Sequence, residues 1–365
     1  MFEVLFHLDV VKCYTGCQLF DIMIIKRIFL LLAPFLLFGN CTNHSKTEIY
    51  QSDRENVLDI KNQVHEILID TPFIGSIARL FLLDDYLIIE DCRSDDQLIR
   101  LFDRQSFDYV KSTGTLGEGP GEIVNIGFIG TCPGSREFYV SDHGKQKIFC
   151  YHVDSLLADP LYFPSVKYEM NRVEFPSRYK YMNDTLSIGL IIRPTGNSGY
   201  QQSVARWNMQ TGGITPMKYT HPQISKKRVV MDASLCYNRY VEGYEYNDLM
   251  TLCDLNGHLI SNIYGPAWND KRTNKTSYYR KVAIYKDKII ALFSGENTFD
   301  ENGPSGIKVL CPTLFHIFDI HGNYLKTLDV GYHVSDFCCD EENSRLIMNF
   351  DDEIQFGYFD LKSVI

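Results

Sequence analysis

Carboxylates recur at the ends of short apolar runs along this chain, and carboxylates are among the side chains best suited to chemistry. The acidic candidates are Glu90, Asp91, Glu122, Asp142, Glu245, Glu296 and Asp351, and His143 and Arg193 are the basic members of the same set. Clustered carboxylates could hold a divalent cation such as Ca²⁺, or act as acid and base on a sugar or lactone. The alternative is that loop tips are acidic because they face water. The residue types leave both interpretations open.

His143, in the sequence S-D-H-G, is the single best candidate for proton transfer, because histidine titrates near neutral pH. The same D-H-G also suits a tight turn. The sequence has no H-E-x-x-H, no C-x-x-C and no G-x-S-x-G, so metal and nucleophile signatures are absent from it. No catalytic residue is therefore assigned, and a binding protein is favoured over an enzyme.

Composition narrows the class of protein. The 365 residues are 45% hydrophobic and 22% charged, which excludes a disordered chain. A net charge of −10 argues against nucleic acid as a partner, since nucleic acid requires a basic face. Eight of the eleven cysteines follow Cys41, and their pairing cannot be deduced from sequence.

The elements that would position the candidates are short strands, because no long helical period is present. Six segments share a pattern in which a strand ends in an aromatic residue or Cys and is followed by Asp or Asn. They are 98–103, 147–154, 203–208, 249–254, 314–319 and 354–360. A similar strand precedes several of them, and D-x-x-G turns such as Asp254 to Gly257 follow some.

This repeat predicts an all-β, six-bladed propeller over residues 60–365, with about 51 residues per blade. The last unit lacks a fourth strand, and a spare strand candidate, Val64 to Asp70, precedes the first unit. We therefore expect the early strand to complete the last blade. Such a closure leaves no exposed sheet edge there. The candidate residues would then surround the mouth of a central channel.

The first forty residues differ from the rest. Lys26 and Arg27 precede the apolar run Ile28 to Phe38, which has the layout of an export signal and is too short to span a bilayer. The end of this run, Leu37 to Cys41, resembles the lipobox of bacterial lipoproteins, in which the Cys becomes lipidated. Asn40 departs from the usual small residue, and the alternative is an ordinary signal peptide. The predicted organisation is an over-extended start over 1–22, a signal over 23–41, a tether over 42–59 and the propeller over 60–365.

One further segment carries a family resemblance. Gly114-Thr115-Leu116-Gly117-Glu118-Gly119-Pro120-Gly121-Glu122 resembles the G-x-x-G-x-G-P-G-E segment of TolB-like six-bladed β-propeller lipoproteins from Bacteroidota. The resemblance covers nearly the whole chain and implies a cell-envelope lipoprotein, anchored to the outer membrane by lipid on Cys41. It brings no established activity.

Two classes of function remain. The leading hypothesis is an envelope lipoprotein whose propeller binds a ligand or a protein partner, with the periplasmic side of the outer membrane favoured because no strongly acidic run follows Cys41. The alternative is a metal-assisted hydrolase or lactonase, with Ca²⁺ held by rim carboxylates and a carbohydrate-type substrate. The propeller fold alone does not decide between them.

Overall fold

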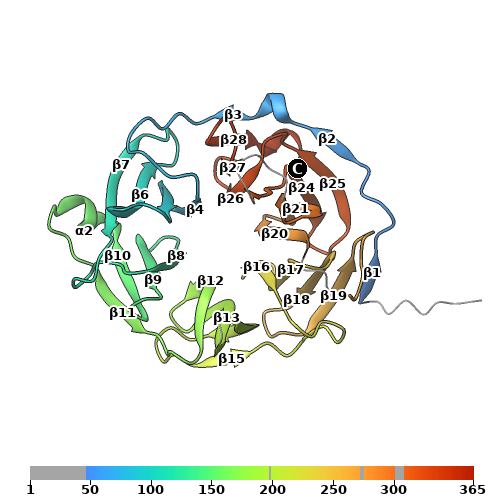
Figure 1. Cartoon of the computed structure of the whole chain (residues 1–365), viewed down its shortest axis with the longest axis horizontal. Helices are drawn as coiled ribbons and strands as arrows, with labels where there is room; N and C mark the ends of the chain where they lie inside the picture. The colour runs from blue at the N-terminus through green and yellow to red at the C-terminus, as the bar shows by residue number, and fades with distance from the viewer. Residues whose placement is uncertain (1–46, 197–198, 272–274, 301–307) are drawn as a thin grey trace, which may run out of the picture. The chain divides into compact units, whose positions relative to one another are not determined.

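The computed structural model describes residues 47–196, 199–271, 275–300 and 308–365. The predicted start, signal and lipidation site at Cys41 lie outside these residues. Within them the chain forms six β-sheets arranged as the blades of a propeller, which confirms the predicted fold (Figure 1). None of the helices in this described part is long and apolar enough to cross a membrane.

Each blade is an antiparallel sheet of four consecutive positions, counted from the centre outward. In chain order the strands of blades 1 to 3 are β4 (Ala78–Leu83), β5 (Tyr86–Asp91), β6 (Gln97–Asp103) and β7 (Tyr109–Thr115); β8 (Ile126–Cys132), β9 (Glu137–Asp142), β10 (Lys147–His152) and β11 (Ser165–Glu169); and β12 (Phe175–Asn183), β13 (Leu186–Gly196), β14 (Gly199–Trp207) and β15 (Ile214–Pro216).

Blades 4 to 6 follow the same plan. Their strands are β16 (Val229–Ser234), β17 (Arg239–Tyr244), β18 (Leu249–Cys253) and β19 (Leu259–Tyr264); β20 (Thr276–Tyr285), β21 (Lys288–Asn297), β24 (Leu314–Asp319) and β25 (Tyr324–Asp329); and β26 (Val334–Asp340), β27 (Arg345–Phe350), β28 (Phe356–Asp360) and β3 (His65–Glu66). Helical turns are short: η1 (Lys61–Gln63), α2 (Val153–Ala158) and η2 (Leu361–Ser363).

The six repeated segments of the sequence coincide with the third strands β6, β10, β14, β18, β24 and β28. The predicted closure is also present, because β3 pairs antiparallel with β28 through Gly357 opposite Glu66 and Tyr358 opposite His65. The paired part is shorter than the expected strand Val64 to Asp70. An early strand thus joins the two ends of the propeller chain.

Apolar side chains from facing sheets form six separate core clusters, and each cluster fills the space between two neighbouring blades. The cluster between blades 5 and 6, for example, contains Phe315 and Phe337 in edge-to-face contact, with ring centroids 5.0 Å apart. This distribution follows from the strands' alternating pattern, which places apolar residues on both faces of the middle strands.

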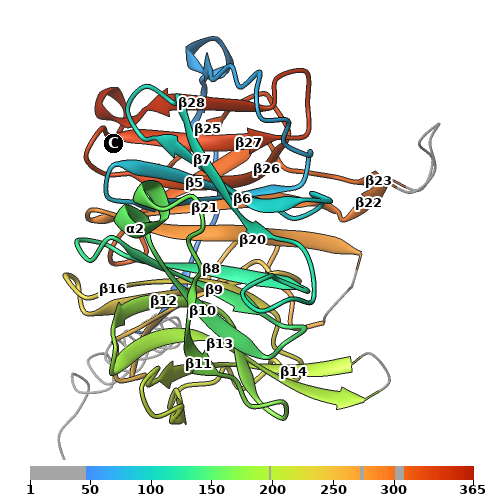
Figure 2. The ribbon, with the colours of Figure 1, turned by 90° about the vertical axis from the view of Figure 1, so that its left-hand side faces the viewer.

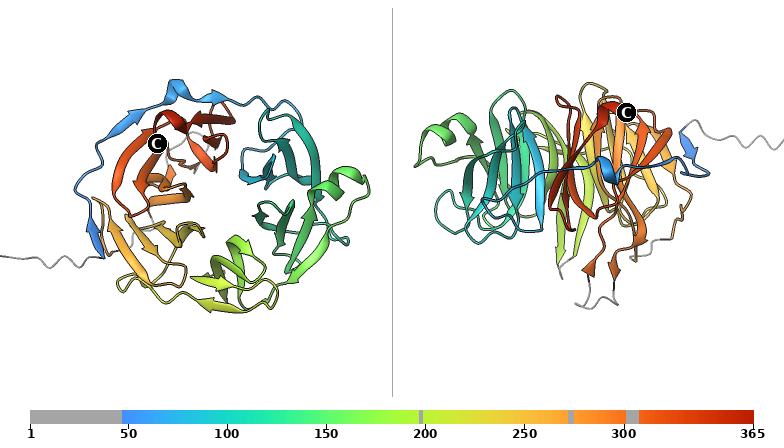
Figure 3. Two further views of the ribbon diagram at one scale, coloured as in Figure 1. Left: turned by 180° about the vertical axis from the view of Figure 1, so that it is seen from behind. Right: turned by 90° about the horizontal axis from the view of Figure 1, so that it is seen from above.

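The segment 47–66, here called the N-terminal strap, runs along the outer edge of blades 4, 5 and 6 before the chain enters blade 1 (Figures 1 and 3). Its strands β1 (Glu48–Tyr50) and β2 (Val57–Asp59) pair parallel with β19 and β25 and become fifth strands of their sheets. The sequence analysis expects a tether over 42–59, and the described part of that range departs from it. Main-chain pairing and a few polar contacts hold this segment, and neither leaves an apolar pattern in the sequence.

The ends of the second strands, where the sequence places its candidate residues, lie on one side of the propeller. On this side β22 (Phe299–Asp300) and β23 (Lys308–Val309) form a small ribbon within the connection between β21 and β24, and the ribbon extends past the blades (Figure 2). We call this side the rim.

Candidate functional site

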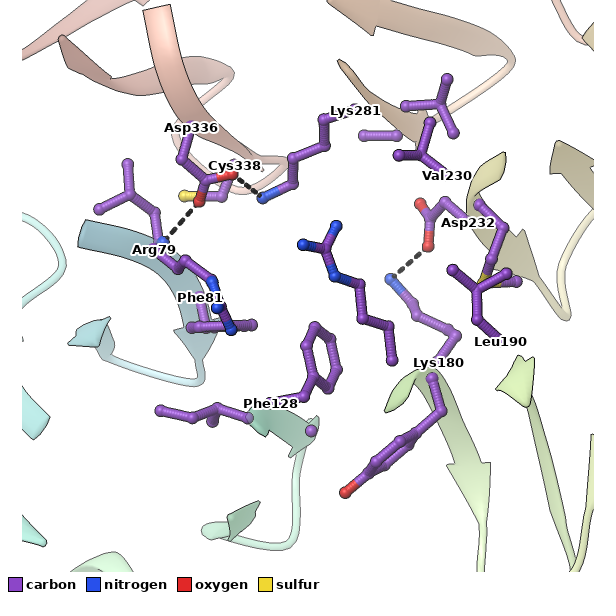
Figure 4. A pocket seen from close by; sticks show the side chains of 18 of the residues that line it. Arg79, Phe81, Phe128, Lys180, Leu190, Val230, Asp232, Lys281, Asp336 and Cys338 are labelled. Atoms are coloured by element: carbon purple, nitrogen blue, oxygen red, sulfur yellow. Dashed lines mark hydrogen bonds and ion pairs between the residues drawn. The ribbon is translucent and has the colours of Figure 1, made fainter. Parts of the chain in front are cut away.

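A central cavity of about 1100 Å³ is the dominant concave feature of the described residues. Its wall is formed mainly by the first strands of the blades, with contributions from all six (Figure 4). The volume lies at the upper end of the range of ligand sites, roughly 300–1,000 Å³. The first strands alternate between side chains packed in the sheets and side chains that line the cavity.

Two lysine–aspartate pairs cross the cavity wall between non-adjacent blades. Lys281 of β20 lies 2.7 Å from Asp336 of β26, and Lys180 of β12 lies 3.4 Å from Asp232 of β16 (Figure 4). Each aspartate uses its other oxygen for the backbone of the following blade. Asp336 accepts the amide of Leu80 at 2.7 Å, and Asp232 accepts that of Ile284 at 2.8 Å. These carboxylates therefore stitch the blades together.

A third ion pair lies where blade 1 meets blade 2. Arg79 of β4 is 3.1 Å from Glu90 of β5, and it donates to the carbonyl of Gly127 on β8 at 2.6 Å. The Glu90 side chain is fully buried, and burial raises the pKa of its carboxyl above the usual value. Its second oxygen, Oε2, has no hydrogen-bond partner. The Arg79 side chain stays about one third exposed, toward the cavity.

Arg178 is the exception among the cavity's cations. It lies on β12, its side chain is exposed to the cavity, and its guanidinium makes no hydrogen bond or ion pair with any described residue. The surrounding protein and the nearby Arg79 guanidinium lower the pKa of Arg178 from its ordinary value, with burial as the larger cause. Asp336, Glu90 and Glu245 oppose this shift at longer range. An unbalanced positive charge therefore faces the cavity.

Aromatic rings line the same cavity. Phe81 and Phe128, on the first strands of blades 1 and 2, meet edge to face with ring centroids 5.3 Å apart (Figure 4). Phe175, at the start of β12, lies 5.3 Å from the ring of His143. All three phenylalanines are only partly buried. The cavity thus combines an unpaired guanidinium with an apolar wall.

His143 is one of the sequence candidates that lines the cavity. Burial lowers the pKa of its imidazole, and its Nε2 is buried without a partner. The ring lies directly against Gly127, where a Cβ atom would be 2.4 Å from Nε2. His143 is therefore neutral near pH 7, and the glycine leaves the space that the ring occupies.

Two other acidic candidates lie at or behind this wall. Glu245 lines the cavity, 3.9 Å from Arg280, and Glu90 holds Arg79 from the second strand. Together with His143 they are the candidates that the fold brings to the cavity.

The remaining acidic candidates at strand ends have structural partners. Asp142 is fully buried and accepts the amides of Val124 and Asn125, at 2.9 and 3.1 Å, from the loop that leads into its own blade. Asp91 accepts the amide of Gly75 at 3.1 Å in the same way. Asp352, next to Asp351, repeats the contact in blade 6 with the amide of His333 at 3.1 Å. The recurrence of acid at these strand ends thus has a common cause, since it fixes the loops between blades.

The other candidates lie apart from the cavity. Glu122 folds back within the glycine-rich loop and accepts the amide of Gly119 at 2.6 Å. Arg193 is exposed and donates from Nε to Glu174 at 2.9 Å. Glu296 is exposed at the end of β21, and Asp351 is half-buried at the end of β27. The set does not converge on one point, and the described residues include no group of three or more His, Cys, Asp or Glu able to hold a metal ion.

The sequence analysis missed the residues of the first strands, above all Arg178 and Arg79. A signal was present in F-P-S-R-Y-K-Y, where Arg178 and Lys180 alternate with the buried Tyr179 and Tyr181. In the innermost strand of a propeller this alternation places charges toward the centre. The third strands dominate the repeat, so the first strands were not used.

The fold and its cavity define the class of this protein, a six-bladed β-propeller with a charged and aromatic central cavity. No family model matches the chain, and no curated protein matches its sequence.

Solved structures of the same fold include a member of the DUF4221 family from Bacteroides vulgatus, with a TM-score of 0.56 and 12% identity over 82% of this chain and 98% of that one. A protein of Bacteroides fragilis assigned as exported has a TM-score of 0.53 and 9% identity over 86% and 98% of the two chains. The calcium-binding protein regucalcin from Agrobacterium tumefaciens has a TM-score of 0.51 and 9% identity over 83% and 95%. At these identities the likeness shows the fold.

Proposed function

We propose that this protein is a cell-envelope lipoprotein, anchored through Cys41, whose propeller binds a small ligand in the central cavity. The leader that ends at Cys41 and the glycine-rich segment 114–122, which resembles TolB-like propeller lipoproteins, support the envelope location. The structural likeness to an exported protein of Bacteroides fragilis agrees with it. The outer membrane, on its periplasmic side, is the proposed site of attachment.

One observation carries the binding function. Arg178 presents an unpaired guanidinium to a cavity of about 1100 Å³, while the other cations of the first strands have carboxylate partners. A buried or enclosed charge without a partner is costly to the free protein. A ligand that supplies the partner recovers that cost on binding. The rim carboxylates are less suited to a site because several of them hold loop amides.

The metal-assisted hydrolase has weaker support. Its rim carboxylates lie on separate blades, and Asp91 and Asp142 already accept backbone amides. Ca²⁺ takes six to eight oxygen ligands, and the described residues do not gather such a set. We therefore propose binding rather than metal-assisted hydrolysis.

A cavity-filling variant tests the proposal. The full-length protein is incubated with a solvent extract of bacterial cell envelopes, and retained compounds are released by denaturation and identified by mass spectrometry. Val230→Trp places a large ring in the cavity, and Val166→Trp makes the same change on the outer strand β11, where Val166 is 47% exposed. We expect the wild type and Val166→Trp to retain compounds that Val230→Trp loses.

A second variant guards against misfolding of the first. Phe81→Ala removes an aromatic wall of the cavity without adding volume. It should also lose the retained compounds while its circular dichroism spectrum stays that of the wild type. Equal retention by the wild type, Val230→Trp and Phe81→Ala would refute binding in the cavity.

A further inference from the structure

The charges of the cavity wall specify what the ligand must carry. Lys281, Lys180 and Arg79 pair with Asp336, Asp232 and Glu90, at 2.7, 3.4 and 3.1 Å. Arg280 faces Glu245 at 3.9 Å.

Arg228, at the rim, is held by the carbonyls of Lys227 and Tyr200 at 2.8 and 3.0 Å, and its guanidinium stacks on the Tyr200 ring at 3.8 Å. Among the described residues of the first strands, Arg178 alone adds a positive charge without a contact partner. The deficit is one negative charge.

The position of Arg178 narrows the chemistry further. Arg79 acts on Arg178 through like-charge repulsion, and the two guanidiniums therefore lie near each other on the walls of one cavity. An anion beside Arg178 would relieve this repulsion and pair with its planar donors. Guanidinium groups bind carboxylates through two parallel N–H···O bonds. A dianion such as a phosphate would bring more charge than the one unpaired cation balances.

The rest of the ligand is specified by the phenylalanines. Phe81, Phe128 and Phe175 line the cavity that contains Arg178 and remain partly exposed within it. Covering such surface is favourable, at about 25 cal/mol for each Å² removed from water. An uncharged sugar would satisfy neither the guanidinium charge nor this apolar surface.

Resting on the proposed binding function, we infer that the ligand is an organic carboxylate with an apolar body. Its carboxylate pairs with Arg178, and its body lies against Phe81 and Phe128. This names the class of ligand and its principal recognition residue, neither of which follows from the propeller fold.

The test uses three probes that share a phenyl ring. The full-length protein is titrated by calorimetry with 3-phenylpropionate, its neutral amide 3-phenylpropanamide, and phenyl phosphate. We expect the carboxylate to bind at least tenfold more tightly than the amide and than the phosphate. Arg178→Gln should weaken carboxylate binding at least tenfold with little change in melting temperature, because the side chain makes no contact within the folded chain.

A matched control removes the same charge elsewhere. Arg193→Gln alters an exposed arginine that pairs with Glu174 and does not line the cavity. It should leave carboxylate binding within twofold of the wild type. Equal effects of the two substitutions would mean that net charge, and not the Arg178 site, attracts the anion, and would overturn the inference.

Other outcomes separate this inference from the function on which it rests. Equal binding of the carboxylate and the amide, or tighter binding of the phosphate, would overturn the carboxylate class. So would a failure of all three probes to bind. In each case the cavity would still stand as a binding site if Val230→Trp and Phe81→Ala lose the envelope compounds, and both ideas would fail if those variants retain them.

Discussion

The N-terminal strap offers the most direct test of how the molecule holds its own chain, because a single arginine anchors it. Arg54 lies between β1 and β2, and its Nη1 is 3.0 Å from Asp248, with the two side chains only 6% and 1% exposed. The guanidinium also donates to the hydroxyl of Tyr279 at 3.0 Å and lies over the rings of Phe293 and Phe318, at 5.1 and 5.7 Å. Truncation of this side chain should therefore leave Asp248 buried without its cation.

The magnitude follows from that burial. Removing one partner of a buried ion pair costs about 3–5 kcal/mol, since the other charge remains in the interior. For Arg54→Ala we expect a loss of this size in the free energy of unfolding, more than a hundredfold in the unfolding equilibrium. Arg193→Ala breaks an ion pair whose arginine is 57% exposed and should cost about 0–1 kcal/mol. The two variants remove the same side chain and differ in its environment.

The assay is urea unfolding followed by tyrosine and tryptophan fluorescence, together with amide hydrogen exchange. The amide of Asn262 donates to Thr47 and that of Thr327 to Asn56, both at 2.7 Å. These two amides should exchange faster in Arg54→Ala because their acceptors belong to the strap. The double variant Arg54→Ala/Asp248→Asn should recover part of the loss, as expected for coupled residues.

The reasoning would be refuted if Arg54→Ala and Arg193→Ala had costs within 0.5 kcal/mol of each other. It would also be refuted if exchange at Asn262 and Thr327 stayed at the wild-type rate in Arg54→Ala.

Three further predictions concern other parts of the chain. Burial, and secondarily Arg54, lower the pKa of His316 to about 2, so the unfolded chain binds a proton below its ordinary pKa of about 6.5 that the folded chain does not. Stability should therefore fall as pH drops below 6.5, and His316→Gln, measured by urea unfolding between pH 7 and 4.5, should reduce that slope by up to about 1.4 kcal/mol per pH unit. Gly121→Ala should cost about 1–3 kcal/mol more than Gly134→Ala, because both have positive φ (73° and 80°) but only Gly121 has a ring, that of Phe163, 2.6 Å from the added Cβ. Cys41→Ser should abolish incorporation of labelled palmitate and release the protein from the membrane fraction, if Cys41 carries the lipid.

Each of these has a result that contradicts it. An unchanged pH slope in His316→Gln would mean that this histidine is not held neutral. Equal losses for Gly121→Ala and Gly134→Ala would mean that the Phe163 contact does not limit the loop. Palmitate labelling that persists in Cys41→Ser would remove the proposed anchor.

Much of the fold is predictable from sequence because it depends on local pattern. Each third strand repeats an apolar run that ends in Asp or Asn, as in Leu314–Asp319, and the turns carry glycine where the backbone needs positive φ, as at Gly257 and Gly322. These signals concern residues that are neighbours along the chain. They were sufficient for the number of blades and for the strand that closes the last one.

The strap shows where such reasoning ends. Val57 and Leu58 are exposed, and the strands β1 and β2 are three residues each, so their sequence resembles a polar linker. What holds them is pairing with β19 and β25 and the burial of Arg54 beside Asp248. These partners lie about 200 residues or more further along the chain, and no local pattern specifies them.

The same division applies to the site. The sequence alone determined that acids end the second strands, and it placed His143 and Glu90 near the centre of the ring. Only the closed ring decided which acids hold backbone amides, as Asp142 does, and which cation is left without a partner. Arg79 and Arg178 meet because blades 1 and 3 face one cavity, and long-range electrostatics depends on distances in space that a strand pattern does not contain.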